Sequence, residues 1–447
     1  MDLAQIVVIL SLVSFLVVWL VVKKSKTDSY ANFTMNRWKL SWFTIACGIS
    51  MTFAGWSAIL TTASIWYSFK WFALVDPIAL MIGLIISIML YKWYLSDKWA
   101  TISDLLSSNH KWLNILVGCV TSFVFVLIVA SQFVALSKML VPYFPSINPL
   151  LITLVVWTGV FSYVFFGWFN SVTKTDVLQF ILIMLFFVVP MWFFVLSWNL
   201  SSYWFGNNHE FVPMPLDYII LFSIPILFTP LSQDINLRIK SAKNSVNGKI
   251  WLFIGGLFYF IIALTAAYVW IYLGKTWVQL ADPEQAIPFF FKEKFPYIGF
   301  VAVVATLAAI VSSLDSYTLN SITSISNDII HPLCKKERMA TKNIKLASLI
   351  TYVLWMGVAL FFNKVLALSL TSLLIYISVL SPIVVGKVLR LNGKSIFIAS
   401  IINILAIILC EVFNAWFEPR AIVYPLFWCV VVLMFFIVNR IIYHKNK

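Results

Sequence analysis

Two clusters of small and polar residues interrupt long apolar segments, and their oxygen atoms are of the kind that a small alkali cation requires. One cluster is SMTFAGWS at 50–57, and the other is AIVSSLDS at 309–316. In the second, the adjacent hydroxyls of Ser312 and Ser313 lie one helical turn beyond the Ala309 carbonyl. A helix broken at the first cluster frees backbone carbonyls, and carbonyls combined with hydroxyls suit Na⁺. The competing interpretations are a face of small residues on which helices pack and serines that bond back to their own helix.

Two further polar clusters lie at the ends of apolar segments. The segment GWFNSVTKTDVLQ at 167–179 places Asp176 in the first turn of a helix, where Thr173 or Thr175 is a suitable N-cap. The segment SQDINLRIKSAK at 232–243 follows another apolar run and by itself indicates a basic juxtamembrane segment. Taken alone, neither cluster indicates more than a capped or charged helix end.

The elements that carry these clusters are long apolar segments. Hydrophobic residues make up 62% of the chain and charged residues 11%. Each apolar segment has about the 17–25 residues that a helix needs to cross a bilayer core. The predicted spans are 3–22, 41–68, 71–94, 112–140, 147–166, 174–198, 216–233, 249–274, 297–330, 344–362, 364–386, 394–412 and 421–443.

Lysine and arginine are concentrated on alternate connections between these spans. With the N-terminus outside, the connections that become cytoplasmic hold most of the 31 basic residues. This asymmetry predicts an outside N-terminus, a cytoplasmic C-terminus and an odd number of spans. The same asymmetry attributes the net charge of +14 to basic residues on the cytoplasmic side that face anionic lipid, and not to nucleic-acid binding. The first apolar run lacks a basic n-region and a small-residue cleavage site, so we predict a retained helix.

The remaining reactive residue types indicate neither an enzyme nor a transition-metal centre. The five cysteines show no CxxC spacing, and the four histidines are scattered. The sequence contains no Walker loop, no G-x-S-x-G elbow and no H-E-x-x-H motif. A membrane-embedded acyl or glycosyl transferase needs a histidine or acidic cluster near one interface and usually a sizeable loop, and neither is evident. We therefore expect no organic cofactor.

In their order along the chain, the polar clusters resemble motifs of the sodium/solute symporter family, which includes the sodium-coupled proline and galactose transporters. The segment 309–316 is similar to the Ala-x-x-Ser-Thr-x-Asp-Ser pattern of the family's eighth core helix, and 167–179 to its Gly-Gly-x-x-Ala-Val-x-x-Thr-Asp-x-x-Gln signature. Gln233 and Arg238 fit the family's Gln-x-x-x-x-Arg segment. The element TISDLL at 101–106 is similar to its Thr-Leu-x-Glu-Tyr-Leu element. The resemblance covers roughly residues 41–390.

The resemblance implies an all-α polytopic membrane protein with about 13 transmembrane helices and a five-plus-five inverted-repeat core behind one extra N-terminal helix. Internal symmetry is not visible in the sequence itself. The implied divisions are 1–40 for the extra N-terminal transmembrane helix and a cytoplasmic loop, 41–198 for the first repeat, 199–215 for an external connection, 216–386 for the second repeat, and 387–447 for two C-terminal transmembrane helices and a short cytoplasmic tail.

The resemblance also implies a sodium site made of hard oxygen ligands. Its implied ligands are the backbone carbonyls of Ser50, Phe53 and Ala309 and the hydroxyls of Ser312 and Ser313. Asp176 would lie on the cytoplasmic exit path and attract the departing ion. No carboxylate is required among the direct ligands.

The implied solute cavity lies between the spans 41–68 and 216–233, and this chain departs from the family there. Thr52 stands where the proline branch has Asp and the galactose branch has Asn, so neither substrate transfers to this chain. Trp56 occupies a region that is usually richer in small residues. Asp76 is either a structural cap or a group that faces the solute, in which case it favours a cationic or amine-bearing one.

The two prolines of the span 216–233 predict a broken helix. Pro225 and Pro230 each remove a backbone donor, and a break between them would line the solute cavity. Phe228 and Thr229 lie between them and offer an aromatic face and a hydroxyl. The competing interpretation is a proline kink that packs against lipid or a neighbouring helix.

The implied function is secondary active transport, in which sodium entry drives the uptake of a small organic solute by alternating access. The expected partners are the solute, sodium and the lipid bilayer, with no nucleic acid, and the expected location is the plasma membrane, in bacteria the inner membrane. Two alternatives stay open: a transporter-like protein that senses solute without flux, and a proton-coupled symporter.

Overall fold

The computed structural model describes only part of the chain. The described residues are 40–55, 59, 62, 74–95, 101–107, 110–144, 146–148, 151, 154, 158, 172–197, 224–243, 245–275, 283–295, 299–334, 341–361 and 365–417. The predicted spans 3–22 and 421–443, and most of 147–166, lie outside them.

The described residues are almost entirely helical and contain no β-strand. The long helices are α8 (Lys111–Leu140), α15 (Ser245–Lys275), α17 (Gly299–Ser324), α19 (Thr341–Phe361), α20 (Val365–Val388) and α21 (Gly393–Phe417). By length and composition, five helices in this part of the chain are long and apolar enough to cross a membrane, and one of them runs over Val172–Leu196. The predicted all-α polytopic fold is confirmed, whereas the helix count and the inverted repeat stay predictions.

The shorter elements surround these helices. They are α3 (Trp42–Phe53), α5 (Val75–Met89), α6 (Tyr91–Leu95), α7 (Ile102–Ser107), η3 (Val141–Tyr143), η4 (Met184–Val188), α10 (Val189–Ser197), α13 (Pro225–Leu231), α14 (Gln233–Ser241), η5 (Pro283–Gln285), α16 (Ala286–Lys294), η6 (Ile325–Ile330) and α18 (His331–Cys334). The helix predicted to end at residue 330 continues to Cys334, and this last turn is half-buried or exposed.

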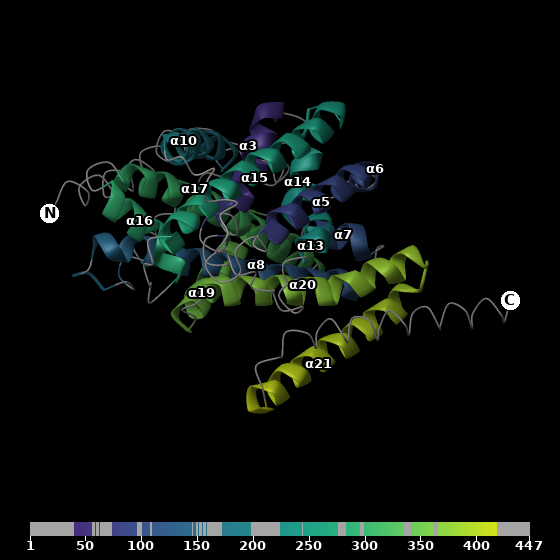
Figure 1. Ribbon diagram of the computed structural model, residues 1–447. Coiled ribbons are helices and arrows are strands. Elements are labelled where there is room, and N and C mark those ends of the chain that lie inside the picture. Colours follow the sequence, from purple (N-terminus) through teal and green to yellow (C-terminus); the bar gives the residue numbers. More distant parts are fainter. Residues whose placement is uncertain are drawn as a thin grey trace.

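Helix α17 lies at the centre of the bundle. It packs against α8 on one side and α3 on another, while α15 covers both α3 and α5. Helix α20 packs along α8, and α21 extends away from the rest of the bundle (Figure 1). Because α17 is covered by its neighbours, its polar residues are shielded from lipid and can face one another or a cavity.

The chain breaks between α13 and α14, but not at the predicted place. Helix α13 is continuous from Pro225 through Pro230, and the break follows at Ser232, which has extended backbone angles. Pro225 occupies the first helical turn, where a missing N–H costs nothing. The hydroxyl of Tyr94 donates to the Pro230 carbonyl, and the hydroxyl of Tyr376 donates to the next carbonyl at 2.7 Å. These two tyrosines satisfy the backbone at the break.

Candidate functional site

The end of α3 and the middle of α17 bring together backbone carbonyls and hydroxyls. The Ser313 hydroxyl oxygen lies 2.7 Å from the Thr52 carbonyl oxygen, 2.9 Å from that of Met51 and 3.4 Å from that of Ala309. The Ser50 carbonyl, by contrast, accepts the N–H of Ala54 within the helix. The hydroxyl therefore contacts the two carbonyls that lie between the predicted ligands Ser50 and Phe53.

Gly55 permits this close approach of the two helices. The chain widens into a π-helical turn at residues 54 and 55. A methyl group at Gly55 would lie 2.3 Å from the Ala309 carbonyl oxygen and 2.4 Å from the Ser313 hydroxyl oxygen. Both distances are too short for any real side chain, so a glycine is needed where α3 meets the serine pair of α17.

Asp176 contacts the same part of α17 from a third helix. The hydroxyl of Ser312 donates to one oxygen of the Asp176 carboxylate at 2.5 Å. The Asp176 side chain is fully buried. The two predicted ligand hydroxyls thus point to different partners, because Ser313 faces α3 while Ser312 faces the helix Val172–Leu196.

Arg238 completes the cluster. Its Nε donates to Asp234 at 2.8 Å, and its Nη2 lies 3.2 Å from the second oxygen of Asp176. The same Nη2 donates to the hydroxyls of Thr52 at 2.7 Å and Ser316 at 3.2 Å. The arginine is 1% exposed. Its buried guanidinium connects its own helix α14 to α3, α17 and the helix Val172–Leu196.

Sequence reasoning gave Arg238 no role beyond a basic juxtamembrane segment and a motif match. One signal was present in the sequence, because Asp234 lies four residues before Arg238 and such pairs face each other on a helix. The contacts with Thr52, Asp176 and Ser316 come from three other elements. Spacing along one helix could not have shown them.

The residues predicted around the solute cavity lie on several elements. Phe228 is buried and packs edge-on against Tyr376, with ring centroids 5.2 Å apart. Thr229 is buried, and its hydroxyl has no hydrogen-bond partner among the described residues. Gly83 of α5 faces this hydroxyl. Trp56 lies outside the described residues.

Asp76 lies in the first turn of α5 and is 6% exposed. It accepts a hydrogen bond of 3.1 Å from the hydroxyl of Tyr259 on α15. The Tyr259 ring in turn packs edge-on against Phe53, the last residue of α3. Among the described residues, no lysine, arginine or histidine nitrogen comes within 4.0 Å of the Asp76 carboxylate. A carboxylate buried beside the end of α3 can therefore accept a positively charged ligand group.

The side chains and carbonyls of this site can bind a cation. Hydroxyls, carbonyls and a carboxylate converge where α3, α17 and the helix Val172–Leu196 meet, and such oxygens are suitable ligands for hard cations. The described residues contain no group of three or more histidine, cysteine, aspartate or glutamate side chains able to hold a metal ion.

The solved structures that are similar to this chain include the following three. A Na⁺-coupled sialic acid symporter in a substrate-bound outward-open state has a TM-score of 0.72 at 15% identity, and the match covers 99% of this chain and 98% of that one. MhsT in complex with L-phenylalanine has a TM-score of 0.60 at 12% identity and 90% and 99% coverage. Mhp1, a nucleobase-cation-symport-1 family transporter in a closed conformation with bromovinylhydantoin bound, has a TM-score of 0.55 at 14% identity and 93% and 96% coverage.

No protein-family model matches the sequence, and the curated proteins contain no match to it. At 12–15% identity the structural likeness establishes architecture and not activity. The chain has the fold that these three solved structures share.

Proposed function

We propose that this protein is a sodium-coupled secondary transporter of the sodium/solute symporter family, and not an enzyme. The observation that carries the proposal is the meeting of α3 and α17, where the Ser313 hydroxyl lies within 2.9 Å of two α3 carbonyls beside a glycine that no other residue can replace. Proteins of the same fold include a Na⁺-coupled sialic acid symporter. Sodium entry would drive solute uptake by alternating access.

The proposed sodium ligands are the carbonyls of Ser50, Phe53 and Ala309 and the hydroxyls of Ser312 and Ser313. The hydrogen bonds described above occupy both hydroxyls. An arriving Na⁺ would displace these bonds, because each hydroxyl oxygen keeps lone pairs for an ion when its proton turns away. Ion binding would thus change the contacts between three elements, which are α3, α17 and the helix that carries Asp176.

Asp176 is proposed to receive the ion as it leaves the site. Its carboxylate already contacts a proposed ligand, Ser312, and its other oxygen faces Arg238. The guanidinium and the ion would compete for the same carboxylate. Movement of Arg238 away from Asp176 would therefore accompany ion release, and it would also break the hydrogen bonds of Arg238 to Thr52 and Ser316.

The proposed solute cavity is bounded by Asp76, Phe228 and Thr229, with Thr52 and Trp56 from the first core helix. The buried Asp76 carboxylate is the strongest recognition group among the described members. Its single described hydrogen bond comes from Tyr259, so a positively charged amine on the solute would complete its neutralisation. We accordingly propose an amine-bearing solute.

The proposed membrane arrangement follows from the charge asymmetry. We propose about 13 transmembrane helices with an inverted repeat, an outside N-terminus and a cytoplasmic C-terminus in the plasma membrane, which in bacteria is the inner membrane. The domain divisions that the family resemblance implies are proposed with it.

The test is uptake into liposomes that contain the purified full chain. An inward Na⁺ gradient is compared with an equal K⁺ gradient, and the solutes screened are amines, amino acids, sugars, organic acids and sialic acids. We expect an amine-bearing solute to accumulate only with Na⁺. Solute binding without accumulation would identify a sensor, and accumulation driven by a pH gradient alone would identify a proton symporter. Either result would refute sodium-coupled transport.

A further inference from the structure

One face of α17 and η6 is polar from the proposed sodium site to the end predicted to be cytoplasmic. Ser316, Asn320, Ser324 and Asn327 follow one another at intervals of three or four residues, which places them on one side of a helix. All four are at most 3% exposed. We call these four residues the polar stripe.

Two members of the polar stripe, Asn320 and Ser324, lack the hydrogen bonds that some other side chains of the same helix make. Thr306 and Thr318 each bond back to the carbonyl four residues earlier, at 2.9 and 2.6 Å. In contrast, the Ser324 hydroxyl and both side-chain polar atoms of Asn320 have no hydrogen-bond partner among the described residues. Buried polar atoms of this kind require a partner such as water or an ion.

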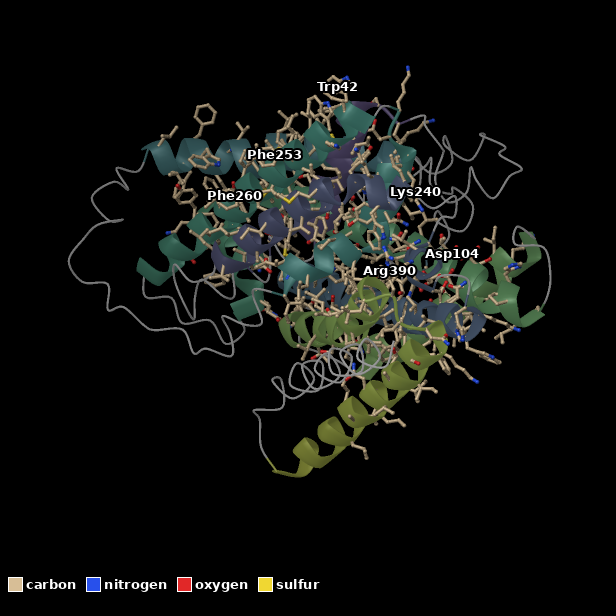
Figure 2. The ribbon with its side chains drawn as sticks, turned by 90° about the vertical axis from the view of Figure 1, so that its right-hand side faces the viewer. Trp42, Asp104, Lys240, Phe253, Phe260 and Arg390 are labelled. Atoms are coloured by element: carbon tan, nitrogen blue, oxygen red, sulfur yellow. The ribbon has the colours of Figure 1, made fainter. Side chains whose placement is uncertain are left out.

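Two carboxylates meet at the far end of the stripe. The Thr101 hydroxyl oxygen lies 2.7 Å from Asp328 and 2.9 Å from Asp104. The Asn327 amide donates to both carboxylates, at 2.8 Å to Asp328 and 3.0 Å to Asp104. Figure 2 shows Asp104 toward the end of the bundle where the basic residues Lys240 and Arg390 are also labelled.

Two oxygen atoms of this cluster have no hydrogen-bond partner among the described residues and are available to bind a cation. Asp328 is fully buried, and its Oδ2 has no hydrogen-bond partner in the described part of the chain. The fully buried Ser103 hydroxyl faces the same carboxyl, but its geometry does not complete a hydrogen bond. No described lysine, arginine or histidine nitrogen lies within 4.0 Å of Asp328. Buried carboxylates of this kind need a compensating positive charge.

Among the described residues, the titratable and charged groups that face Asp328 do not provide that charge. Cys119 of α8 and Tyr376 of α20 are near enough to interact with it electrostatically, but neither is a cation. The ammonium group of Lys387 in α20 donates a hydrogen bond to the carbonyl of Leu105 in α7. The polar neighbours Thr101, Ser103 and Asn327 are uncharged.

We propose that Asp104 and Asp328, with Thr101 and Ser103, form a second sodium site, which receives Na⁺ along the polar stripe before its release. The proposal rests on the proposed function, because the ion would come from the site between α3 and α17. All available ligands are oxygen atoms, which suits a hard cation. The site is separate from Asp176, which contacts Ser312 near the start of the stripe.

The test is the number of ²²Na⁺ ions bound by the purified full chain at saturation. We expect two ions for the wild-type protein and one for Asp328→Asn. The double variant Ser312→Ala/Ser313→Ala should also bind one ion. Ser348→Ala is the matched control, because this buried serine of α19 bonds back to its own helix at 2.8 Å. If Asp328→Asn does not fold, Thr101→Val replaces it in the measurement.

The outcomes separate this inference from the proposed function. Wild-type binding of a single ion that disappears in Ser312→Ala/Ser313→Ala would overturn the second site and leave sodium coupling intact. Equal Na⁺ binding by wild type and Asp328→Asn, with a changed pH dependence, would mean that the carboxylates hold a proton and would also overturn it. A wild-type protein that binds no Na⁺ would overturn both.

Discussion

Replacing Arg238 with leucine removes the only cation that the described structure places against Asp176 and Asp234. We expect the variant to be destabilised by roughly 3–5 kcal/mol, the usual cost of deleting one partner of a buried ion pair. The reason lies in the burial, because both carboxylates and the guanidinium are almost completely shielded from solvent. A surface ion pair would contribute only about 0–1 kcal/mol.

The contacts of Arg238 decide where in this range the effect falls. Asp176 keeps the hydrogen bond from Ser312 after the substitution, whereas the described structure gives Asp234 no second cation. The hydroxyls of Thr52 and Ser316 lose a charged donor but can bond to each other, since they are 3.4 Å apart. Most of the cost therefore comes from Asp234, and we expect Asp234→Asn to recover more stability than Asp176→Asn does.

A double-mutant cycle measures this coupling. Arg238→Leu is combined with Asp234→Asn, and unfolding is followed in a mixed-detergent titration. We expect an interaction energy of about 1–3 kcal/mol, because the two residues share a direct contact. The control combines Arg238→Leu with Lys138→Met, whose partner is Glu284, and this pair should be additive to within about 0.5 kcal/mol. Additivity of Arg238→Leu and Asp234→Asn would refute the assignment of Arg238 as the neutralising cation.

Three further predictions concern the proposed sodium and solute sites. Ser312→Ala/Ser313→Ala should abolish Na⁺-stimulated uptake while the protein still inserts, and unchanged Na⁺ dependence would remove both hydroxyls from the site. Asp176→Asn should lower the apparent Na⁺ affinity by roughly tenfold or more, through loss of a charged hydrogen bond worth about 1.5–3 kcal/mol; a lowered melting temperature with normal coupling would indicate only a cap. Cysteines at Phe228 and Thr229 should react with aqueous reagents and be protected by solute, and failure of both to react while uptake survives would place the cavity elsewhere.

The long, strongly apolar helices were the most predictable part of the fold. Helix α8 was predicted as 112–140 and runs over Lys111–Leu140, and α20 was predicted as 364–386 and runs over Val365–Val388. Their apolar residues continue around the whole helix, so length and hydropathy alone define the ends. No knowledge of the partners is needed for such a segment.

The break near α13 shows where this reasoning stops. Two prolines correctly indicated an irregular segment, but the chain breaks at Ser232 and not between Pro225 and Pro230. A proline removes one donor locally, and α13 nevertheless continues through Pro230. The carbonyls of Pro230 and Leu231, which the break at Ser232 leaves without helical partners, accept hydrogen bonds from Tyr94 and Tyr376, and both tyrosines belong to other spans. The sequence contains these tyrosines but does not show that they lie beside the end of α13.

The hydropathy of the spans carries more information than their number. The span Val301–Cys334 has a mean hydropathy of 1.5, which is lower than the 2.5 of α8 and lower than that of α15. Within its apolar stretch of 18 residues, 89% of the residues are buried. The helix Val172–Leu196 has a mean hydropathy of 2.5, and only 33% of its window is buried. A polar helix is tolerated in a membrane only when protein or a cavity covers it. The least apolar long span is therefore the one enclosed by the others, and it is the span that holds Ser312, Ser313 and the polar stripe.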